Sequence, residues 1–129
     1  MAIQFDFSGK VAFVTGGGTG IGRATALAFA KAGASVAVVG RTEASTQETV
    51  QLIEQAGGRA IAIRCDVAKE DEVQAAVAKA IATFGRIDLA LNNAGVEHEV
   101  IALADISTEE WERQIGINLG GVFFSMKHQ

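Results

Sequence analysis

The 129-residue sequence contains no tyrosine, no proline and a single cysteine, Cys65. One cysteine cannot form an internal disulfide, so the sequence fits a reducing compartment and offers no cysteine pair for metal binding. No segment is apolar over the length of a membrane span, so we expect no membrane partner. Residues 1–10 contain Asp6 and no apolar stretch, which argues against a signal peptide. Together these absences predict a cytoplasmic protein.

The composition is that of a folded domain, with 49% apolar and 20% charged residues. A chain of this length can bury one modest core, so we expect a single domain over residues 1–129. The net charge of −4 argues weakly against nucleic acid as a partner, although it leaves room for a local basic site. No repeat, linker or low-complexity segment divides the chain.

Residues 15–22 (TGGGTGIG) are the most informative stretch. They follow an apolar run at residues 11–14 and precede a helical pattern, so they predict a strand, a tight glycine turn and a helix N-terminus. Glycines let backbone N–H groups approach a phosphate closely, and the helix dipole favours negative charge at the same point. The glycines at 16, 20 and 22 vary the usual dinucleotide spacing G-x-G-x-x-G, and we interpret the turn as a phosphate-binding loop.

Apolar runs and helical patterns alternate along the chain. Strands are expected at residues 11–14, 35–40, 60–65 and 87–91. Helices are expected between them, with these inward-facing residues: Ile21, Thr25, Ala28, Phe29 and Ala32 in the first; Val50, Ile53 and Ala56 in the second; Val73, Ala76, Val77, Ala80, Ile81 and Phe84 in the third. Four such alternations predict an α/β fold in which βαβ units build a doubly wound parallel sheet.

A capping box at residues 107–110 predicts the start of a last, long helix, with Ser107 as N-cap and Glu110 at the third helical position. One apolar stripe marks this helix: Trp111, Ile115, Leu119, Val122 and Met126. The helical pattern is still running at Gln129. We therefore expect the sheet to be incomplete on its C-terminal side, with an open edge at the fourth strand and part of the stripe uncovered.

The distinctive polar and glycine motifs all follow strands, where ligands bind to parallel sheets. Arg41 follows the second strand, at a position where many dinucleotide enzymes have an acid that binds the ribose of NAD. A guanidinium there suits the 2′-phosphate of NADP, and the alternative is a solvated arginine at a helix start. Asp66 follows the third strand and either accepts a hydrogen bond from adenine or caps the next helix.

Other reactive residue types carry less weight. His98 and His128 lack a cluster of Cys, Asp or Glu at metal spacing, so we interpret both as surface residues and expect no metal. Cys65 is interpreted as a small buried hydrophobe at a strand end. Trp111 is expected in a core or an interface.

Taken together, four motifs resemble the short-chain dehydrogenase/reductase family: T-G-x-x-x-G-I-G at 15–22, Asp66-Val67, N-N-A-G at 92–95, and I-N-L-G-G-V-F at 117–123. The resemblance covers essentially the whole chain. It implies a Rossmann-like fold and an NAD(P)-dependent oxidoreductase that moves a hydride between nicotinamide and a small carbonyl or alcohol substrate. It also implies a homo-oligomer, a dimer or tetramer, in the complete protein.

Carried over by position, the resemblance assigns the following roles. The pyrophosphate would be held by Gly16, Gly17, Gly18, Thr19, Gly20, Ile21 and Gly22. Arg41 would favour NADP over NAD. The adenine would be flanked by Asp66 and Val67. Asn92 would contact the cofactor ribose region, and Ala94 and Gly95 would also bind the cofactor. The catalytic assignment within this sequence is Asn118, which would support a water in the proton relay.

One departure from the family is large. The family's catalytic serine and Tyr-x-x-x-Lys find no match here, and the sequence has no tyrosine at all. The sequence therefore resembles the N-terminal half of such an enzyme, cut within the long helix, and residues 1–129 alone are expected to be inactive. The alternative is a non-catalytic half-domain that binds a nucleotide or a protein partner.

Overall fold

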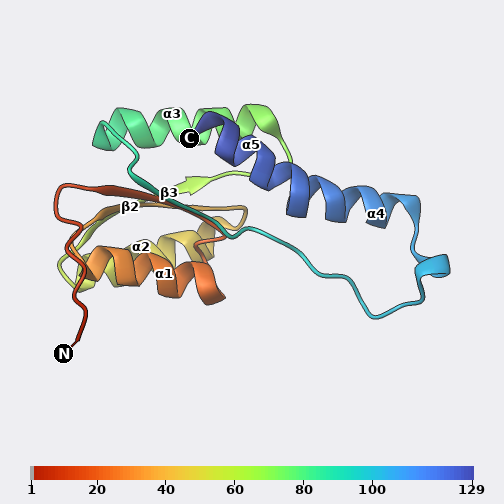
Figure 1. The fold of residues 1–129 in the computed structure, drawn as a ribbon, viewed down its shortest axis with the longest axis horizontal. Helices are drawn as coiled ribbons and strands as arrows, with labels where there is room; N and C mark the ends of the chain where they lie inside the picture. The colour runs from red at the N-terminus through yellow and green to blue at the C-terminus, as the bar shows by residue number, and fades with distance from the viewer. Residues whose placement is uncertain (1) are drawn as a thin grey trace.

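The computed structural model describes residues 2–129 and contains a parallel four-stranded sheet between two layers of helices (Figure 1). The strands are β1 (Val11–Thr15), β2 (Ser35–Gly40), β3 (Arg59–Arg64) and β4 (Leu89–Asn92). Helices α1 (Gly20–Lys31) and α2 (Glu43–Gln55) cover one face, and α3 (Glu70–Phe84) and α5 (Gly121–His128) cover the other. The predicted α/β class is confirmed.

The strand order is β3-β2-β1-β4, so the chain moves outward from β1 to β3 and then returns to the other side of β1. Parallel sheets that reverse in this way have a crevice at the carboxyl ends of the strands, beside the point of reversal. Within residues 2–129, β4 pairs only with β1, which confirms the predicted open edge.

The two central strands are buried on both faces because their side chains alternate between two cores. Phe13, Ala37 and Val39 face α3, whereas Val14, Val36 and Val38 face α1 and α2. All five residues of β1 are buried. This double cover explains why these strands show no polar alternation in the sequence.

The face that α1 turns to the sheet differs from the prediction. Ile21 is 73% exposed and Ala28 is exposed, while the buried residues of the helix are Gly22 and Ala26. Small side chains let this helix lie close to the sheet, and a pattern search weighted toward large apolar residues selects the wrong face. Similar smaller errors occur at Ala56 and Ile81, which are exposed, and at Thr46 and Thr49, which are buried on α2.

The predicted last helix is interrupted. Helix α4 (Thr108–Ile115) and α5 are joined by η2 (Gly116–Gly120), a wide π-helical turn, and a short 3₁₀ turn, η1 (Leu103–Asp105), precedes α4. Ser107 caps α4 as predicted, since its hydroxyl accepts a hydrogen bond from the Glu110 backbone N–H at 3.1 Å. The Glu110 carboxylate binds Arg113 and Gln114 instead of completing the box, and the Arg113 hydrogen bond first of all lowers the Glu110 pKa to about 2.

The exposed apolar stripe on this segment departs from the prediction at one position. Trp111, Leu119 and Met126 are 56%, 64% and 67% exposed, as the expected stripe required. Beyond η2, however, the exposed residue is Phe123, at 59%, while Val122 is partly buried. A π-helical turn holds one more residue per hydrogen-bonded loop than an α-helical turn, so every residue after it is displaced around the helix.

Candidate functional site

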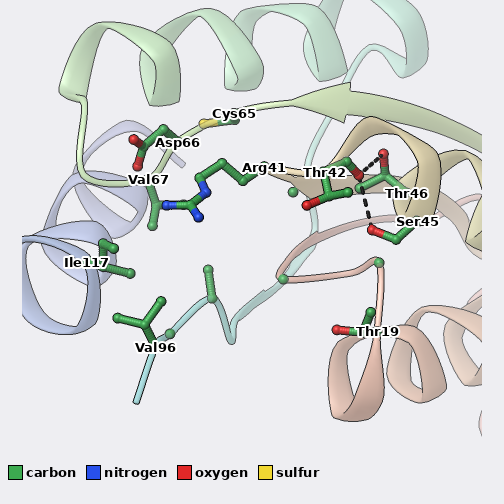
Figure 2. A pocket seen from close by; sticks show the side chains of 15 residues that line it. Thr19, Arg41, Thr42, Ser45, Thr46, Cys65, Asp66, Val67, Val96 and Ile117 are labelled. Carbon is green, nitrogen blue, oxygen red and sulfur yellow. Dashed lines mark hydrogen bonds between the residues drawn. The ribbon is translucent and has the colours of Figure 1, made fainter. Parts of the chain in front are cut away.

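A cavity of about 240 Å³ lies at the carboxyl ends of all four strands, where the fold places its crevice (Figure 2). Each strand contributes the residues that follow it: Gly16, Gly18 and Thr19 after β1; Gly40, Arg41 and Thr42 after β2; Cys65, Asp66 and Val67 after β3; Ala94, Gly95 and Val96 after β4. Ser45, Thr46 and Ile117 complete the wall. The fold thus brings together most of the residues that the sequence singled out.

The glycine turn after β1 adopts a backbone that requires glycine. Gly16 and Gly20 have φ angles of +62° and +52°, in the left-handed region that other residues rarely occupy. Gly22 is constrained differently, because a Cβ there would lie 2.0 Å from the Gly16 carbonyl oxygen. The three glycines therefore allow the turn to fold back tightly onto the first turn of α1.

Within residues 2–129, no side chain caps the N-terminus of α1. Its N-cap, Thr19, has extended backbone and makes no side-chain capping hydrogen bond, and the first turn contains no acidic residue. Helices α3 and α4 differ, since α3 carries three acids in its first turn and α4 is capped by Ser107. An uncapped end of a 12-residue helix, facing a cavity, presents free N–H groups and a partial positive charge. This arrangement fits a phosphate group.

Arg41 adds a full positive charge to the same cavity. Its side chain extends from the end of β2 across the cavity toward Asp66 and Val67 (Figure 2). No hydrogen bond or ion pair links its guanidinium to any of residues 2–129, whereas Arg23, Arg86 and Arg113 are all paired. A planar guanidinium that no protein group occupies can bind a phosphate through two hydrogen bonds.

Asp66 lines the cavity and does not cap the next helix, whose N-cap is Lys69. Its Oδ1 accepts a hydrogen bond from the Ala68 backbone N–H at 3.0 Å, in the turn between β3 and α3. Its own backbone N–H donates to Glu72 Oε1 at 3.1 Å, and this hydrogen bond is the main reason why the Glu72 pKa is lowered.

Cys65 is buried beside Asp66, at 2% exposure, and burial first of all raises the pKa of its thiol to about 11. Nearby Glu72, Asp66 and Asp71 add to the shift. A thiol with this pKa stays protonated near neutral pH and is a poor nucleophile. Its interpretation as a small buried hydrophobe agrees with the structure.

Asn92 lies outside the cavity wall, whereas Ala94 and Gly95 line it. The Asn92 amide pairs with the Gln129 amide through two hydrogen bonds, 3.1 and 2.7 Å. The following residues are fixed by Thr15, whose hydroxyl oxygen accepts hydrogen bonds from the Asn93 and Ala94 backbone N–H groups at 3.0 and 3.1 Å. This role of Thr15 was missed, because nothing in its local sequence predicts a bond to a residue almost 80 positions away.

Asn118 lies in η2, and its side chain is fully engaged by protein groups. Its Oδ1 accepts from the Val96 backbone N–H at 2.8 Å, and its Nδ2 donates to the Val96 carbonyl at 2.9 Å and to Gln114 Oε1 at 3.1 Å. The pair of bonds resembles one rung of a sheet and ties the loop after β4 to the wide turn. Asn118 does not line the cavity, although its neighbour Ile117 does.

The histidines show no metal-binding arrangement. His128 Nε2 lies 3.0 Å from Glu70 Oε1, which also binds Lys127, and His98 contacts the Glu99 carbonyl. Across residues 2–129, no three His, Cys, Asp or Glu side chains are grouped as metal ligands would be. The same residues include no helix with the length and apolar character needed to cross a bilayer.

Comparison with curated proteins finds relatives of similar sequence but greater length. The chain is 43% identical over 125 residues to a protein named short chain dehydrogenase/reductase astE from Aspergillus oryzae, covering 96% of this chain and 48% of that one. It is 42% identical over 123 residues to cyclohexanol dehydrogenase from an Acinetobacter species, covering 95% and 49%. The chain thus spans about half the length of the curated relatives it matches.

Solved structures agree with this fold. A short-chain type dehydrogenase/reductase from Mycobacterium marinum superposes with a TM-score of 0.93 at 42% identity, over 96% of this chain and 50% of that one. A metagenomic short-chain oxidoreductase, solved in complex with NADP, superposes with a TM-score of 0.91 at 33% identity, over 95% and 55%. The sequence profile described as short chain dehydrogenase matches residues 10–129. The chain belongs to the short-chain dehydrogenase/reductase family of oxidoreductases.

Proposed function

We propose that the protein is an NAD(P)-dependent reductase or dehydrogenase of small carbonyl or alcohol substrates, and that it prefers NADP. The observation that carries this proposal is the pairing of an uncapped α1 N-terminus with an unpaired Arg41 in one cavity. Two anion-binding groups on neighbouring strand ends suit a ligand with phosphates at two places, as NADP has.

The residues of the cavity fit the parts of that cofactor. The turn from Gly16 to Gly22 would hold the pyrophosphate at the α1 N-terminus, and Arg41 would hold the 2′-phosphate. Asp66 and Val67 would flank the adenine, with Ala94 and Gly95 beside the ribose. Asn92 would act indirectly, since its amide is paired with Gln129. When bound, the nicotinamide donates or accepts the hydride.

Residues 1–129 lack the tyrosine that the family resemblance implies as the proton donor to the carbonyl oxygen, and Cys65 is a poor substitute. The thiol of Cys65 has its pKa raised to about 11 by burial. We propose that Asn118 positions the loop after β4 through its hydrogen bonds to Val96. It would then support the water relay indirectly, from outside the cavity wall. Residues 1–129 alone are therefore expected to bind the cofactor without reducing a carbonyl.

A second candidate, a non-catalytic module that binds nucleotide and a protein partner, rests on a different observation. Trp111, Ile115, Leu119, Phe123 and Met126 form an exposed apolar face along α4, η2 and α5. Apolar surface of this kind promotes association. We propose that this face takes part in homo-oligomer formation in either case, and that the protein resides in the cytoplasm, as its free, buried Cys65 suits.

The test is a calorimetric titration of the full-length protein with NADPH and NADH, followed by an assay of carbonyl-dependent NADPH oxidation. We expect NADPH to bind about 10- to 100-fold more tightly, because one charged hydrogen-bonded pair contributes about 1.5–3 kcal/mol. Binding of neither nucleotide would overturn the proposal. Binding without turnover against a broad panel of carbonyls and alcohols would favour the second candidate.

A further inference from the structure

A buried threonine that lies outside the cavity wall makes a hydrogen bond to the backbone of the glycine turn. Thr49 on α2 is fully buried, at 0% exposure, and its Oγ1 lies 2.9 Å from the Gly17 carbonyl oxygen. The same Oγ1 lies 3.2 Å from the carbonyl of Ser45 and 3.0 Å from Nε of Arg23 on α1. None of the sequence motifs included Thr49 or Arg23.

The direction of these hydrogen bonds follows from the available protons. The Arg23 Nε–H can only donate, so the Thr49 oxygen accepts from it, and the one hydroxyl proton is left for a carbonyl. The shorter of the two carbonyl distances is to Gly17. Arg23 is held in place by Glu48, 3.2 Å from its Nη2, and by the Ser45 carbonyl at 3.3 Å.

The backbone of Gly17 is hydrogen-bonded to both β2 and α2. Its backbone N–H donates to the Val39 carbonyl on β2 at 3.1 Å, so β2 and α2 hold its two polar groups. Its neighbours Gly16 and Gly18 line the cavity, and so does Ser45, one helical turn before Thr49. The Thr49 hydroxyl therefore joins the glycine turn directly to α2 and contributes to the spacing between them.

We propose that Thr49, oriented by Arg23, is a positioning residue that sets the distance between the glycine turn and the Arg41 side of the cavity. The inference rests on the proposed function, because this distance matters only for a ligand that contacts both sides. A dinucleotide with a 2′-phosphate does so. A ligand that binds at one side only is insensitive to it.

The experiment compares ligands of two lengths in Thr49→Val, Thr49→Ser and wild-type full-length protein. We expect Thr49→Val to weaken NADP binding by about 3- to 10-fold, the size of one hydrogen bond, and Thr49→Ser to restore it to within about twofold of wild type. Adenosine 2′-monophosphate, which reaches only the Arg41 side, should bind all three proteins equally. Thr83→Val is the matched control, since the Thr83 hydroxyl bonds within its own exposed helix.

Arg23→Met provides a second variant if Thr49→Val fails to fold, because it keeps the Thr49 hydroxyl and removes the donor that orients it. We expect it to weaken NADP binding about twofold to threefold with no change for adenosine 2′-monophosphate. Unchanged NADP affinity in the folded variants, with only a lower melting temperature, would overturn the positioning role alone. If wild type binds no dinucleotide, the proposed function fails and the positioning role fails with it.

Discussion

Two sets of polar groups, one at each end of the sheet, differ in whether they are paired within the protein. At the amino ends of the strands, Asp88 Oδ2 accepts a hydrogen bond from the Val11 backbone N–H at 2.9 Å. Arg86 in turn bonds both oxygens of that carboxylate, at 2.6 to 2.9 Å. At the carboxyl ends, the Arg41 guanidinium and the Thr19 side chain make no such bonds within residues 2–129.

This difference indicates which polar groups contribute to the stability of the fold and which remain available to a ligand. Paired groups at the amino end stabilise the fold and have nothing left for a ligand. Unpaired groups at the carboxyl end add little to the fold and remain available. Substitutions at the amino end should therefore change unfolding, and those at the carboxyl end should change binding.

The largest effect is expected where the two roles coincide, at Gly22. A Cβ in Gly22→Ala would lie 2.0 Å from the Gly16 carbonyl, so the turn must open. We expect dinucleotide affinity to fall by at least ~100-fold and thermal stability to fall as well. Gly116→Ala is the control, because its Cβ meets only Ala68 at 3.9 Å. Wild-type affinity in Gly22→Ala, measured by calorimetry, would contradict the site.

Arg41→Ala should affect binding alone. Loss of one guanidinium–phosphate interaction is expected to cost about 1.5–3 kcal/mol in NADPH affinity, with no change for NADH or for the melting temperature. Arg64→Ala is the matched control, since Arg64 ends the neighbouring strand and lies outside the cavity wall. Equal discrimination between the cofactors in wild type and Arg41→Ala would exclude Arg41 as the selector.

Asp88→Asn should affect stability alone. Hydrogen bonds from Arg86, and then from the Val11 backbone, lower the pKa of Asp88 below its ordinary 3.8. A lowered pKa stabilises the fold above pH 3.8, and this contribution is lost as the pH falls below it. Urea unfolding of Asp88→Asn should show a lower midpoint at pH 7 and a weaker dependence on acid than wild type. Asp105→Asn serves as the control, and a loss of dinucleotide affinity in Asp88→Asn would break the comparison.

The smallest effect is expected at Cys65, which lies at the carboxyl end yet behaves as core. Burial raises the pKa of its thiol from 9.0 to about 11, so its contribution to stability is full below pH 9 and is lost as the pH rises toward 11. We expect alkylation by iodoacetamide, followed by mass spectrometry at pH 8, to be about 100-fold slower in native than in urea-unfolded protein. Rapid native alkylation would show that the thiol is exposed.

The sequence predicted the elements that depend on local pattern. Continuous apolar runs located the four strands, and the glycine turn predicted the position of the cavity, because both follow from residue types that are close in the chain. The fourth strand was placed two residues early at its start, since Ile87 continues the apolar run although pairing begins at Leu89.

The remainder depended on contacts that local pattern does not encode. The buried face of α1 is formed by Gly22 and Ala26, which carry little hydrophobic signal, so Ile21 was wrongly placed inside. Thr49 reads as a polar residue on a solvent face until its partners Gly17 and Arg23 are known. Asn118 is fixed by Val96, 22 positions away, and the wide turn around it has no signature in an otherwise helical pattern.

That wide turn makes the last segment sensitive to the number of its residues. Removing any one residue from 116–120 would let α4 and α5 join as a regular helix, and the side chains of α5 would keep their positions around the axis because a π-helical turn holds one extra residue in about the rotation of an α-helical turn. The change would fall within the turn itself, where Asn118 would lose its alignment with Val96. A deletion in the exposed loop at residues 97–101 changes no helical phase. Among homologous sequences, length variation should therefore be frequent in that loop and absent from the five residues of the turn.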